Sequence, residues 1–221
     1  MTSQLAFALP VAAAFRREDF FPSPSNAAAL TTVEAPQTRR LLLIGPHGSG
    51  KTHLAHIFAA AHAAEPLTAD TIATRLPSLP PTASIVIDNA DGCTDEPALF
   101  HLLNLLAPAG RLMLTATTPP RDWGLTLPDL FSRLQAMPTL RLDPPDDALL
   151  SAVLVKLFAD RQIIVPPNLI PYLVTRMERS CAAARTLVAA LDARALAAAR
   201  PISRALAAEV LDMGPSERNR E

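Results

Sequence analysis

The segment at positions 45–52, which reads Gly-Pro-His-Gly-Ser-Gly-Lys-Thr, constrains the fold of this chain more than any other feature. It satisfies the pattern G-x-x-x-x-G-K-[ST] in full, between an apolar run at 41–44 and a helical pattern at 51–62. In a strand, loop and helix of this kind, backbone amides of the loop point at phosphate oxygens and the helix adds its positive end. The sequence therefore predicts a phosphate-binding loop.

Three side chains around this loop have expected roles in holding a nucleotide. Lys51 is predicted to reach the β and γ phosphates, and the hydroxyl of Thr52 is predicted to ligate Mg²⁺. The apolar run at 84–88 ends in Asp88, whose carboxylate is predicted to hold the same ion through water. The sequence therefore predicts a site for ADP or ATP with Mg²⁺. The loop residues expected to bind the nucleotide are Gly45, Pro46, His47, Gly48, Ser49, Gly50, Lys51 and Thr52.

The residue after Asp88 limits the chemistry expected at this site. It is Asn89, and an amide cannot accept a proton from an attacking water. Asp91 is a weaker candidate for that role because it falls in a predicted loop. The site is therefore expected to bind nucleotide well and to hydrolyse it slowly, with weak intrinsic ATPase activity at most.

Strand and helix patterns alternate in the first part of the chain and then give way to helices alone. Runs at 41–44, 84–88, 111–116 and 139–142 are predicted strands, and they alternate with predicted helices at 51–62, 96–107 and 127–135. Strands that are apolar along their length and alternate with helices are typical of a parallel sheet with helices on both faces. After two prolines, further helices are predicted at 146–161, 167–178, 182–199 and 203–212.

The expected fold is therefore an α/β nucleotide-binding core followed by a small all-helical lid domain. The N-terminal part mixes short apolar runs with Pro and Ser, and is expected to be an extended arm. Paired prolines cannot continue a strand and suit a helix start, so the boundary is expected there. The predicted parts are an arm at 1–38, the core at 39–143, the lid at 144–213 and a frayed tail at 214–221.

Composition excludes several classes of protein. Twenty Lys and Arg against 21 Asp and Glu leave a formal charge of −1, which gives no global attraction to nucleic acid or anionic membrane. Cys93 and Cys181 lie far apart and indicate neither a disulfide framework nor a zinc site. His53 and His56 lack a third ligand, so no metal besides Mg²⁺ is expected. No apolar run approaches the roughly 18 residues of a membrane span, so we expect a cytoplasmic protein.

With these motifs, the chain resembles the AAA+ ATPases, and within them the DnaA/Hda family, with closest similarity to its short regulatory branch of the Hda type. The resemblance covers positions 4 to 212. The aromatic and Ser-Asn signature on the adenine side of such proteins appears in REDFFPSPSN, which implies that Phe20, Phe21 and Asn26 bind nucleotide. The AAA+ resemblance implies a P-loop parallel sheet followed by a helical lid.

Three further segments carry the resemblance and imply residue roles. The segment LTATTPPRDW is similar to sensor 1, with Thr117 where an acidic residue is common. The segment LPDLFSRL resembles box VII, which implies that Arg133 is an arginine finger acting in trans on nucleotide held by a neighbouring subunit. The segment RSCAAARTLVAALD resembles the start of the third lid helix, which implies that Arg185 is sensor 2 and touches the phosphates.

The two ends of the chain carry expectations about partners. The N-terminal segment Gln4-Leu5-Ala6-Phe7-Ala8-Leu9 resembles the peptide with which Hda-type proteins bind the sliding clamp. The clamp is the β subunit of the DNA polymerase. Gln4 is expected to hydrogen-bond in a polar pocket, while Leu5, Phe7 and Leu9 fill an apolar cleft. Only nine residues follow Asp212, so no helix-turn-helix domain and no sequence-specific DNA binding are expected.

Three functions remain open from the sequence. The first is a regulatory protein that, with the DNA-loaded clamp, stimulates ATP hydrolysis by the replication initiator DnaA and so negatively regulates initiation of DNA replication. The second is a self-assembling AAA+ ATPase that acts as a helicase loader or remodelling factor in DNA replication. The third is a nucleotide-binding adaptor with no effect on any ATPase. The sequence also leaves open whether the chain forms a homodimer.

Overall fold

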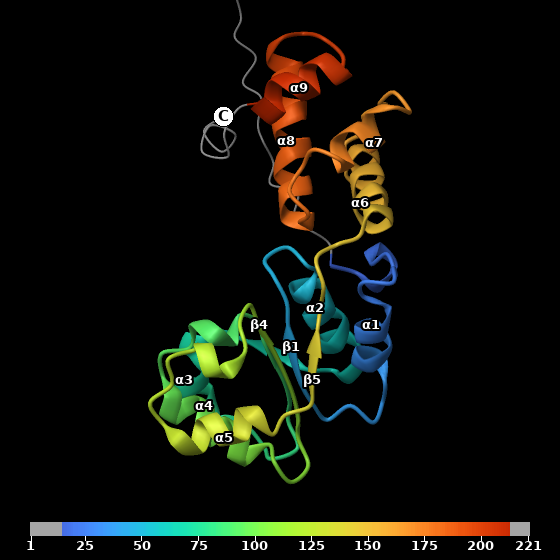
Figure 1. Cartoon of the computed structure of the whole chain (residues 1–221). Coiled ribbons are helices and arrows are strands. Elements are labelled where there is room, and N and C mark those ends of the chain that lie inside the picture. Colours follow the sequence, from blue (N-terminus) through green and yellow to red (C-terminus); the bar gives the residue numbers. More distant parts are fainter. Residues whose placement is uncertain (1–14, 213–221) are drawn as a thin grey trace, which may run out of the picture.

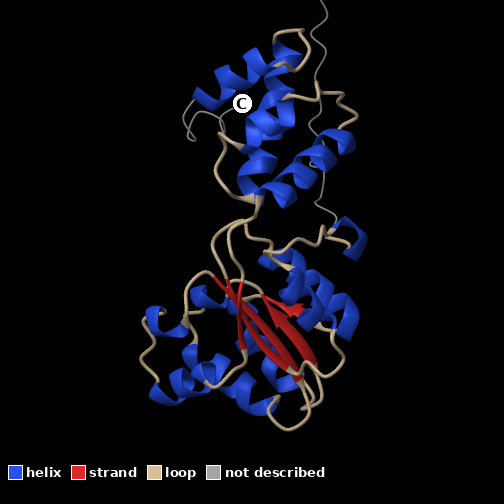
Figure 2. Ribbon diagram, turned by 45° about the vertical axis from the view of Figure 1, so that its right-hand side comes forward, coloured by secondary structure: helices blue, strands red, loops and turns tan. Residues whose placement is uncertain are grey.

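The computed structural model describes residues 15–212, which form an α/β core and a helical lid (Figure 1). The core contains a parallel sheet in the strand order β2-β3-β4-β1-β5. The strands are β1 (Arg40–Ile44), β2 (Glu65–Leu67), β3 (Ser84–Ile87), β4 (Arg111–Ala116) and β5 (Thr139–Arg141). Figure 2 shows them side by side between layers of helices.

The helices of the core lie on both faces of this sheet, and those of the lid follow β5. The core helices are α1 (Ala27–Glu34), α2 (Lys51–His62), α3 (Ile72–Arg75), α4 (Glu96–Leu105) and α5 (Pro128–Gln135). The lid helices are α6 (Asp147–Asp160), α7 (Leu169–Val174), α8 (Cys181–Ala197) and α9 (Arg204–Asp212). Short 3-10 turns include η1 (Arg17–Asp19), η4 (Ala90–Gly92) and η5 (Pro120–Asp122).

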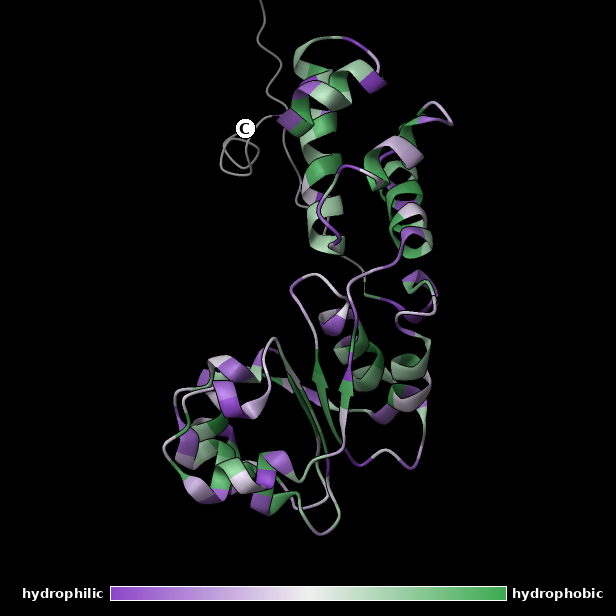
Figure 3. Cartoon of the chain, viewed as in Figure 1, coloured by the Kyte–Doolittle hydropathy of each residue, from purple (hydrophilic) through white to green (hydrophobic). Residues whose placement is uncertain are grey.

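Strand β1 explains why the sheet strands are apolar along their whole length. Successive side chains of a strand point to opposite faces. Leu41 and Leu43 join the hydrophobic cluster formed with α1 and α2, whereas Leu42 and Ile44 join the cluster formed with α3, α4 and α5. Burying a side chain of this size stabilises the fold by about 1.5–3 kcal/mol. Figure 3 shows the resulting hydrophobic colour of the strands inside the core.

The lid has a hydrophobic cluster of its own. Leu154 of α6, Leu187 of α8 and Leu206 of α9 are among its buried members. Its first helix begins at a side-chain cap, because a carboxylate oxygen of Asp146 accepts a hydrogen bond from the backbone N–H of Leu149 at 2.8 Å. The other oxygen of Asp146 lies 3.4 Å from the backbone nitrogen of Ser25, so the segment before α1 contacts the start of the lid.

The expected parallel α/β sheet with helices on both faces, followed by helices alone, is confirmed. The predicted helix at 51–62 has the bounds observed for α2. Three elements were not expected, namely β2, α1 and the one-turn helix α3. Strand β2 was not predicted, because it has three residues, includes Pro66 and lies at the edge of the sheet. The expectation of an extended arm at 1–38 is wrong for Ala27–Glu34, whose Leu30 and Val33 pack into the core as part of α1.

Glu96 joins the start of α4 to the start of α5. Its carboxylate accepts hydrogen bonds from the backbone N–H groups of Thr126, at 2.9 Å, and of Leu127, at 2.8 Å, and Leu127 is the N-cap residue of α5. These two bonds, first that of Thr126 and then that of Leu127, hold the pKa of Glu96 below its ordinary value. Because α5 carries Arg133, Glu96 helps to fix the position of that arginine.

We expect Glu96→Gln to lower the thermal midpoint at neutral pH, with a difference from the wild type that shrinks in acid. A carboxyl group whose pKa falls on folding stabilises the folded state above its unfolded pKa, and this contribution is lost as pH falls through the folded pKa. Melting curves of both proteins at about pH 7 and about pH 3.5 bracket the unfolded value of about 4.3. A difference of the same size at both pH values would contradict the role of the charge.

Candidate nucleotide-binding site

The loop between β1 and α2 has the bend that its glycines predict. Gly48 and Gly50 have φ angles of 72° and 100°, in the left-handed region that favours glycine. The first loop residue, Gly45, donates its N–H to the carbonyl of Ala116 at 3.1 Å, which ties the loop to the end of β4. Helix α2 then starts at Lys51, so its amino end faces the loop. This is the geometry expected of a phosphate-binding loop.

Lys51 is a buried positive charge inside this loop. Only 5% of the residue is exposed, and its Nζ donates to the carbonyls of Gly45 at 2.8 Å and Pro46 at 2.9 Å. Burial lowers the pKa of Lys51, while Asp88 and then Asp91 act in the opposite direction. Since carbonyl dipoles compensate a buried ammonium less well than an anion does, a phosphate group beside Lys51 is electrostatically favoured.

Ser49 also fits a bound ligand. Its hydroxyl is buried and has no hydrogen-bond partner among the described residues. A buried polar atom without a partner costs free energy unless something else bonds to it. Ser49 lies between Gly48 and Gly50, whose backbones are in the left-handed region. A phosphate oxygen held in this loop would give the Ser49 hydroxyl its missing hydrogen bond.

The predicted magnesium ligands Thr52 and Asp88 come together. The hydroxyl of Thr52 in the first turn of α2 donates to Oδ2 of Asp88, which follows β3, at 2.7 Å. Thr115 of β4 donates its hydroxyl to the other oxygen of Asp88. Hydroxyl and carboxylate oxygens are ligands that Mg²⁺ prefers, so these side chains fit the predicted ion. Thr115 was not predicted as a site residue, although its hydroxyl stands out in an otherwise apolar strand.

The loop after Asp88 brings a second carboxylate to this edge of the sheet. Asn89 has a φ of 55°, and its N–H donates to the hydroxyl of Thr115 at 2.9 Å. Asp91 accepts hydrogen bonds from the backbone N–H of Thr117, at 2.7 Å, and from the hydroxyl of the same residue. The predicted sensor 1 residue Thr117 is therefore bonded to Asp91, a pairing that sequence spacing did not reveal.

A cavity of about 470 Å³ lies between the segment before α1, the phosphate loop and the lid. Its volume is in the range of about 300–1,000 Å³ that small-molecule sites occupy. The predicted residues in its lining are Phe20, Phe21, Asn26, Ser49, Gly50 and Arg185. Lid residues that sequence reasoning missed also line it, among them Leu149, Val153, Lys156 and Leu157 of α6. In the sequence, these lid residues show only the spacing of one helix face. That spacing predicts packing and gives no sign of a ligand.

Asn26 shapes the wall of this cavity through the backbone of the segment before α1. Its Oδ1 accepts from the N–H of Ser23 at 2.9 Å, and its Nδ2 donates to the carbonyl of Phe21 at 3.0 Å. Phe20 is buried against the core, whereas Phe21 remains 47% exposed. The amide of Asn26 therefore holds the backbone of Phe21, and Asn26 also lines the cavity, while its part in nucleotide binding stays a prediction.

Arg185 packs against a cluster of aromatic side chains at the cavity. The guanidinium lies over the ring of Phe15, 5.6 Å from its centroid, and that ring stacks on His56 at 4.7 Å. His53 meets the edge of Phe20 at 5.1 Å. Burial is the main cause that lowers the pKa of His53. Phe15 was not predicted as a site residue, and the two histidines, three apart along a helix, were expected to lie on an ordinary helix face.

The lid contacts the phosphate loop directly at the start of α8. The N–H of Cys181 donates to the carbonyl of Gly48 at 2.9 Å, and the hydroxyl of Ser180 caps the helix by accepting from the N–H of Ala183. Arg185 lies about one turn further along the same helix. This contact therefore couples the position of Arg185 to that of the loop.

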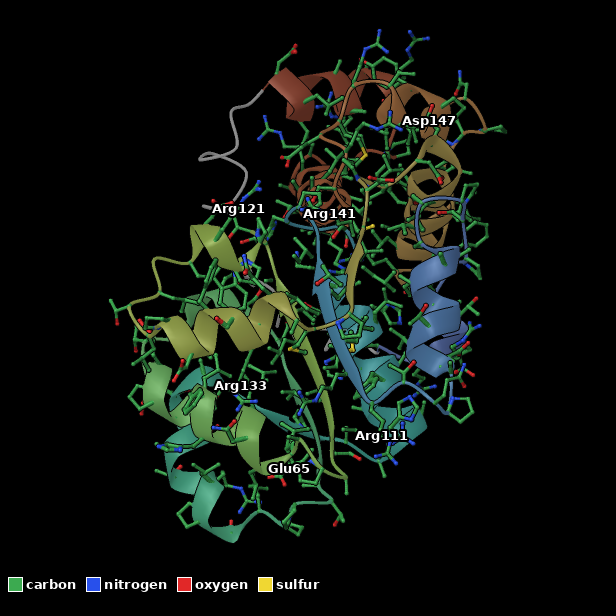
Figure 4. The ribbon with its side chains drawn as sticks, turned by 60° about the horizontal axis from the view of Figure 1, so that its bottom comes forward. Glu65, Arg111, Arg121, Arg133, Arg141 and Asp147 are labelled. Atoms are coloured by element: carbon green, nitrogen blue, oxygen red, sulfur yellow. The ribbon has the colours of Figure 1, made fainter. Side chains whose placement is uncertain are left out.

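Arg133 lies apart from these residues. It is exposed on α5, with its guanidinium over the ring of Phe100 of α4 at 5.5 Å from the centroid. Figure 4 shows it beside these two helices and away from the lid, where Asp147 is labelled. It does not line the cavity. Among the predicted residues, Lys51 lies within the loop and Thr52 bonds Asp88 beside it, Ser49, Gly50 and Arg185 line the cavity, and Arg133 has neither position.

Some predictions fall outside the region that the structure describes. The clamp-binding residues Gln4, Leu5, Phe7 and Leu9 lie before residue 15, and their role stays a prediction. Between residues 15 and 212, no helix is both long enough and apolar enough to cross a membrane.

Comparison with solved structures relates this geometry to known proteins. Domain III of the Thermotoga maritima replication initiation protein DnaA matches with a TM-score of 0.74 and 19% identity, over 92% of this chain and 98% of that chain. A replication initiator DnaA bound to AMPPCP and single-stranded DNA matches with a TM-score of 0.64 and 15% identity, over 79% and 63%. A mutant of Thermotoga maritima RuvB matches with a TM-score of 0.69 and 18% identity, over 87% and 70%.

These likenesses extend over both the core and the lid, and they confirm the predicted fold, a parallel α/β sheet with helices on both faces followed by a helical lid. With identities of 19% or less, they concern the fold and not the activity. No protein-family model matches the sequence.

We expect Gly48→Ala to destabilise the protein and to loosen the contact between loop and lid. The left-handed φ of Gly48 disfavours a side chain, and an added Cβ would lie 2.0 Å from the hydroxyl oxygen of Ser180. The expected cost is about 1–3 kcal/mol of unfolding free energy, measured by urea denaturation. Gly92→Ala is the matched control, because a Cβ there meets nothing within 4 Å. Equal stability of the two variants would contradict this contact.

Proposed function

We propose that this chain is a nucleotide-binding AAA+ regulator of the Hda type. Together with the DNA-loaded sliding clamp, it stimulates ATP hydrolysis by the replication initiator DnaA and so restrains the initiation of DNA replication. The observation that carries this proposal is the position of Arg133, which is exposed on α5 over the ring of Phe100 and is absent from the lining of the cavity beside the phosphate loop. The similarity of the fold to domain III of DnaA supports the choice of partner.

Within its own site, the chain would hold ADP or ATP mainly to set the conformation of the lid. Lys51, the loop amides and the helix α2 terminus bind the phosphates, while Thr52 and Asp88 would hold Mg²⁺, which supplies charge neutralisation. Asn89 offers no base for an attacking water, so turnover in this pocket is slow. The contact of Gly48 with Cys181 links the loop to the lid, so nucleotide held by the loop would fix one angle of the lid.

The guanidinium of Arg133 is the group that acts on ATP bound to the partner. A planar guanidinium with five donors neutralises charge that develops on a transferring phosphoryl group, an effect worth roughly a thousandfold or more in rate. Its neighbour Phe100 holds it by a cation–π contact, and no carboxylate within residues 15–212 is in ion-pair distance of it. The charge is therefore available to an ATP-bound partner without first breaking an ion pair.

The second candidate is a self-assembling AAA+ ATPase that acts as a helicase loader or remodelling factor. Asp91 favours it, because this carboxylate, after Asp88, opposes the lowering of the Lys51 pKa and would substitute for the carboxylate that Asn89 lacks. Such a protein would hydrolyse ATP alone, at a specific rate that rises with its own concentration. The regulator would show little hydrolysis until DnaA is added.

An assay of ATP hydrolysis by DnaA, with clamp loaded on DNA, tests the proposed function. We expect the wild type to stimulate hydrolysis, and Arg133→Ala to reduce the stimulation by about a thousandfold, to background. Arg133→Lys is expected to restore little, because an ammonium lacks the planar fork. Gln4→Ala is expected to abolish stimulation by loss of clamp binding, while nucleotide binding stays unchanged.

Arg75→Ala is the matched control for these variants. Arg75 is also exposed, but its guanidinium is held by the carboxylate of Glu65 at 2.7 Å, and it is expected to be dispensable. Full stimulation by Arg133→Ala would overturn the regulatory mechanism. Hydrolysis by the isolated chain that is lost in Lys51→Ala would favour the second candidate.

A further inference from the structure

A second hollow of the molecule, with a volume of about 280 Å³, lies where the phosphate loop meets the lid. His47 of the loop forms one part of its wall, and residues between the end of α7 and the first turns of α8 form most of the rest. Figure 1 shows the start of α8 at the end of the lid nearest to the core. No described residue lines both this hollow and the cavity of the nucleotide site, so the two are separate.

The inner wall of this hollow is apolar. Met177 and Leu187 belong to the hydrophobic cluster of the lid and are only 9% and 1% exposed. Ala183 also lines the hollow, and its single methyl group fills little of the space. The volume falls just below the range of about 300–1,000 Å³ that is typical of small-molecule sites. It therefore suits a protruding apolar side chain better than a whole nucleotide.

Two arginines share one aromatic ring beside the hollow. The Cζ atom of Arg176, which lines the hollow, lies 4.2 Å from the ring centroid of Tyr172. The Cζ atom of Arg204, at the start of α9, lies 4.5 Å from the same centroid. Cation–π contacts with the ring thus hold two full positive charges close together, although like charges repel. An anion placed at both guanidinium groups would offset that repulsion.

Neither of these arginines has a carboxylate partner in the described part of the chain. By contrast, the guanidinium of Arg200, in the same domain, lies 2.8 Å from the carboxylate of Glu209. Arg176 uses one Nη1 donor in a hydrogen bond of 3.2 Å to the hydroxyl of Thr175. Because a guanidinium has five donors in a planar fork, both Arg176 and Arg204 retain donors for a carboxylate.

The charges around the hollow favour an acidic peptide over a nucleic acid as the ligand. Glu178 lines the hollow and is exposed, so a continuous row of phosphates would meet a negative charge close to Arg176. The formal charge of −1 on the whole chain also gives a polyanion no long-range attraction. A peptide can instead place a single carboxylate on the arginines, in a bidentate pair, and an apolar side chain in the hollow.

We propose that this hollow is a docking site for a peptide segment of a partner protein, in which an acidic residue stands next to an apolar one. The acidic side chain binds Arg176 and Arg204, and the apolar side chain packs against Met177 and Leu187. Because His47 belongs to the phosphate loop, the bound segment contacts the core and the lid together. This surface is additional to the nucleotide site and goes beyond the proposed function.

NMR titration of the ¹⁵N-labelled full chain tests this inference, with a short capped peptide in which one leucine stands between two glutamates. We expect saturable shifts of the backbone signals of residues that line the hollow, His47 and Leu187 among them. Arg176→Gln is expected to weaken binding by about tenfold or more, because a charge-assisted pair is lost. Arg204→Gln is expected to weaken it about threefold, through the loss of one nearby charge.

Ala183→Met tests the apolar part of the site while both arginines remain. Its longer side chain fills part of the hollow without disfavouring the helix, so the peptide is expected to bind more weakly. Arg200→Gln is the matched control, because Arg200 is an exposed arginine of the lid that Glu209 already holds and that does not line the hollow. It is expected to bind the peptide as the wild type does.

A second peptide, with glutamines in place of the glutamates, measures the part of the charge and is expected to bind about tenfold more weakly or less. Equal affinity for the two peptides, shifts confined to residues away from the hollow, or wild-type affinity in Arg176→Gln would overturn the inference. So would binding at these residues of duplex DNA alone, or of a synthetic peptide of residues 213–221 alone, since the occupant would then be of another kind. None of these results bears on the proposed function, which the assay with DnaA tests separately.

Discussion

The buried ammonium of Lys51 is the charge on which the arrangement of the whole site depends. It is held in place by carbonyls of the loop that it follows, and this requires the left-handed bend at Gly48 and Gly50. The same bend turns the carbonyl of Gly48 towards the lid, where Cys181 donates to it. One short loop thus sets the position of the cation, the start of α2 and the first turn of α8.

The sheet order explains how distant segments meet at this loop. Strands β3 and β4 lie on one side of β1, so the ends of three neighbouring parallel strands carry Asp88, Thr115 and the loop itself. The carboxyl ends of parallel strands are where ligands bind in open α/β sheets. Arg133 does not belong to that edge: it lies on α5, which packs beside α4, and its guanidinium is over the ring of Phe100. This division of the molecule into a binding edge and a separate arginine surface is the physical basis of the proposed regulatory role.

Much of this arrangement could be predicted from the sequence, because the strongest signals are local. The glycine pattern and the apolar strand before it predicted where α2 begins. The apolar strand that ends in Asp88 predicted that this carboxylate and Thr52 belong to one Mg²⁺ site. Contacts across the sheet could not be predicted, since the pairings of Thr115 with Asp88 and of Thr117 with Asp91 depend on the strand order. The aromatic contacts of Phe15 arise from docking of the segment before α1, which the Pro and Ser content suggested would be extended.

Calorimetric titration of the purified chain with ADP in the presence of Mg²⁺, for the wild type and for Lys51→Ala, addresses the claim that the glycine bend serves to hold nucleotide phosphates. Saturable binding by the wild type is expected, weakened about tenfold or more in the variant because a charge-assisted hydrogen bond of about 1.5–3 kcal/mol is lost. A wild type that takes up neither ADP nor ATP, or a Lys51→Ala protein that binds as tightly as the wild type, would contradict this interpretation of the site.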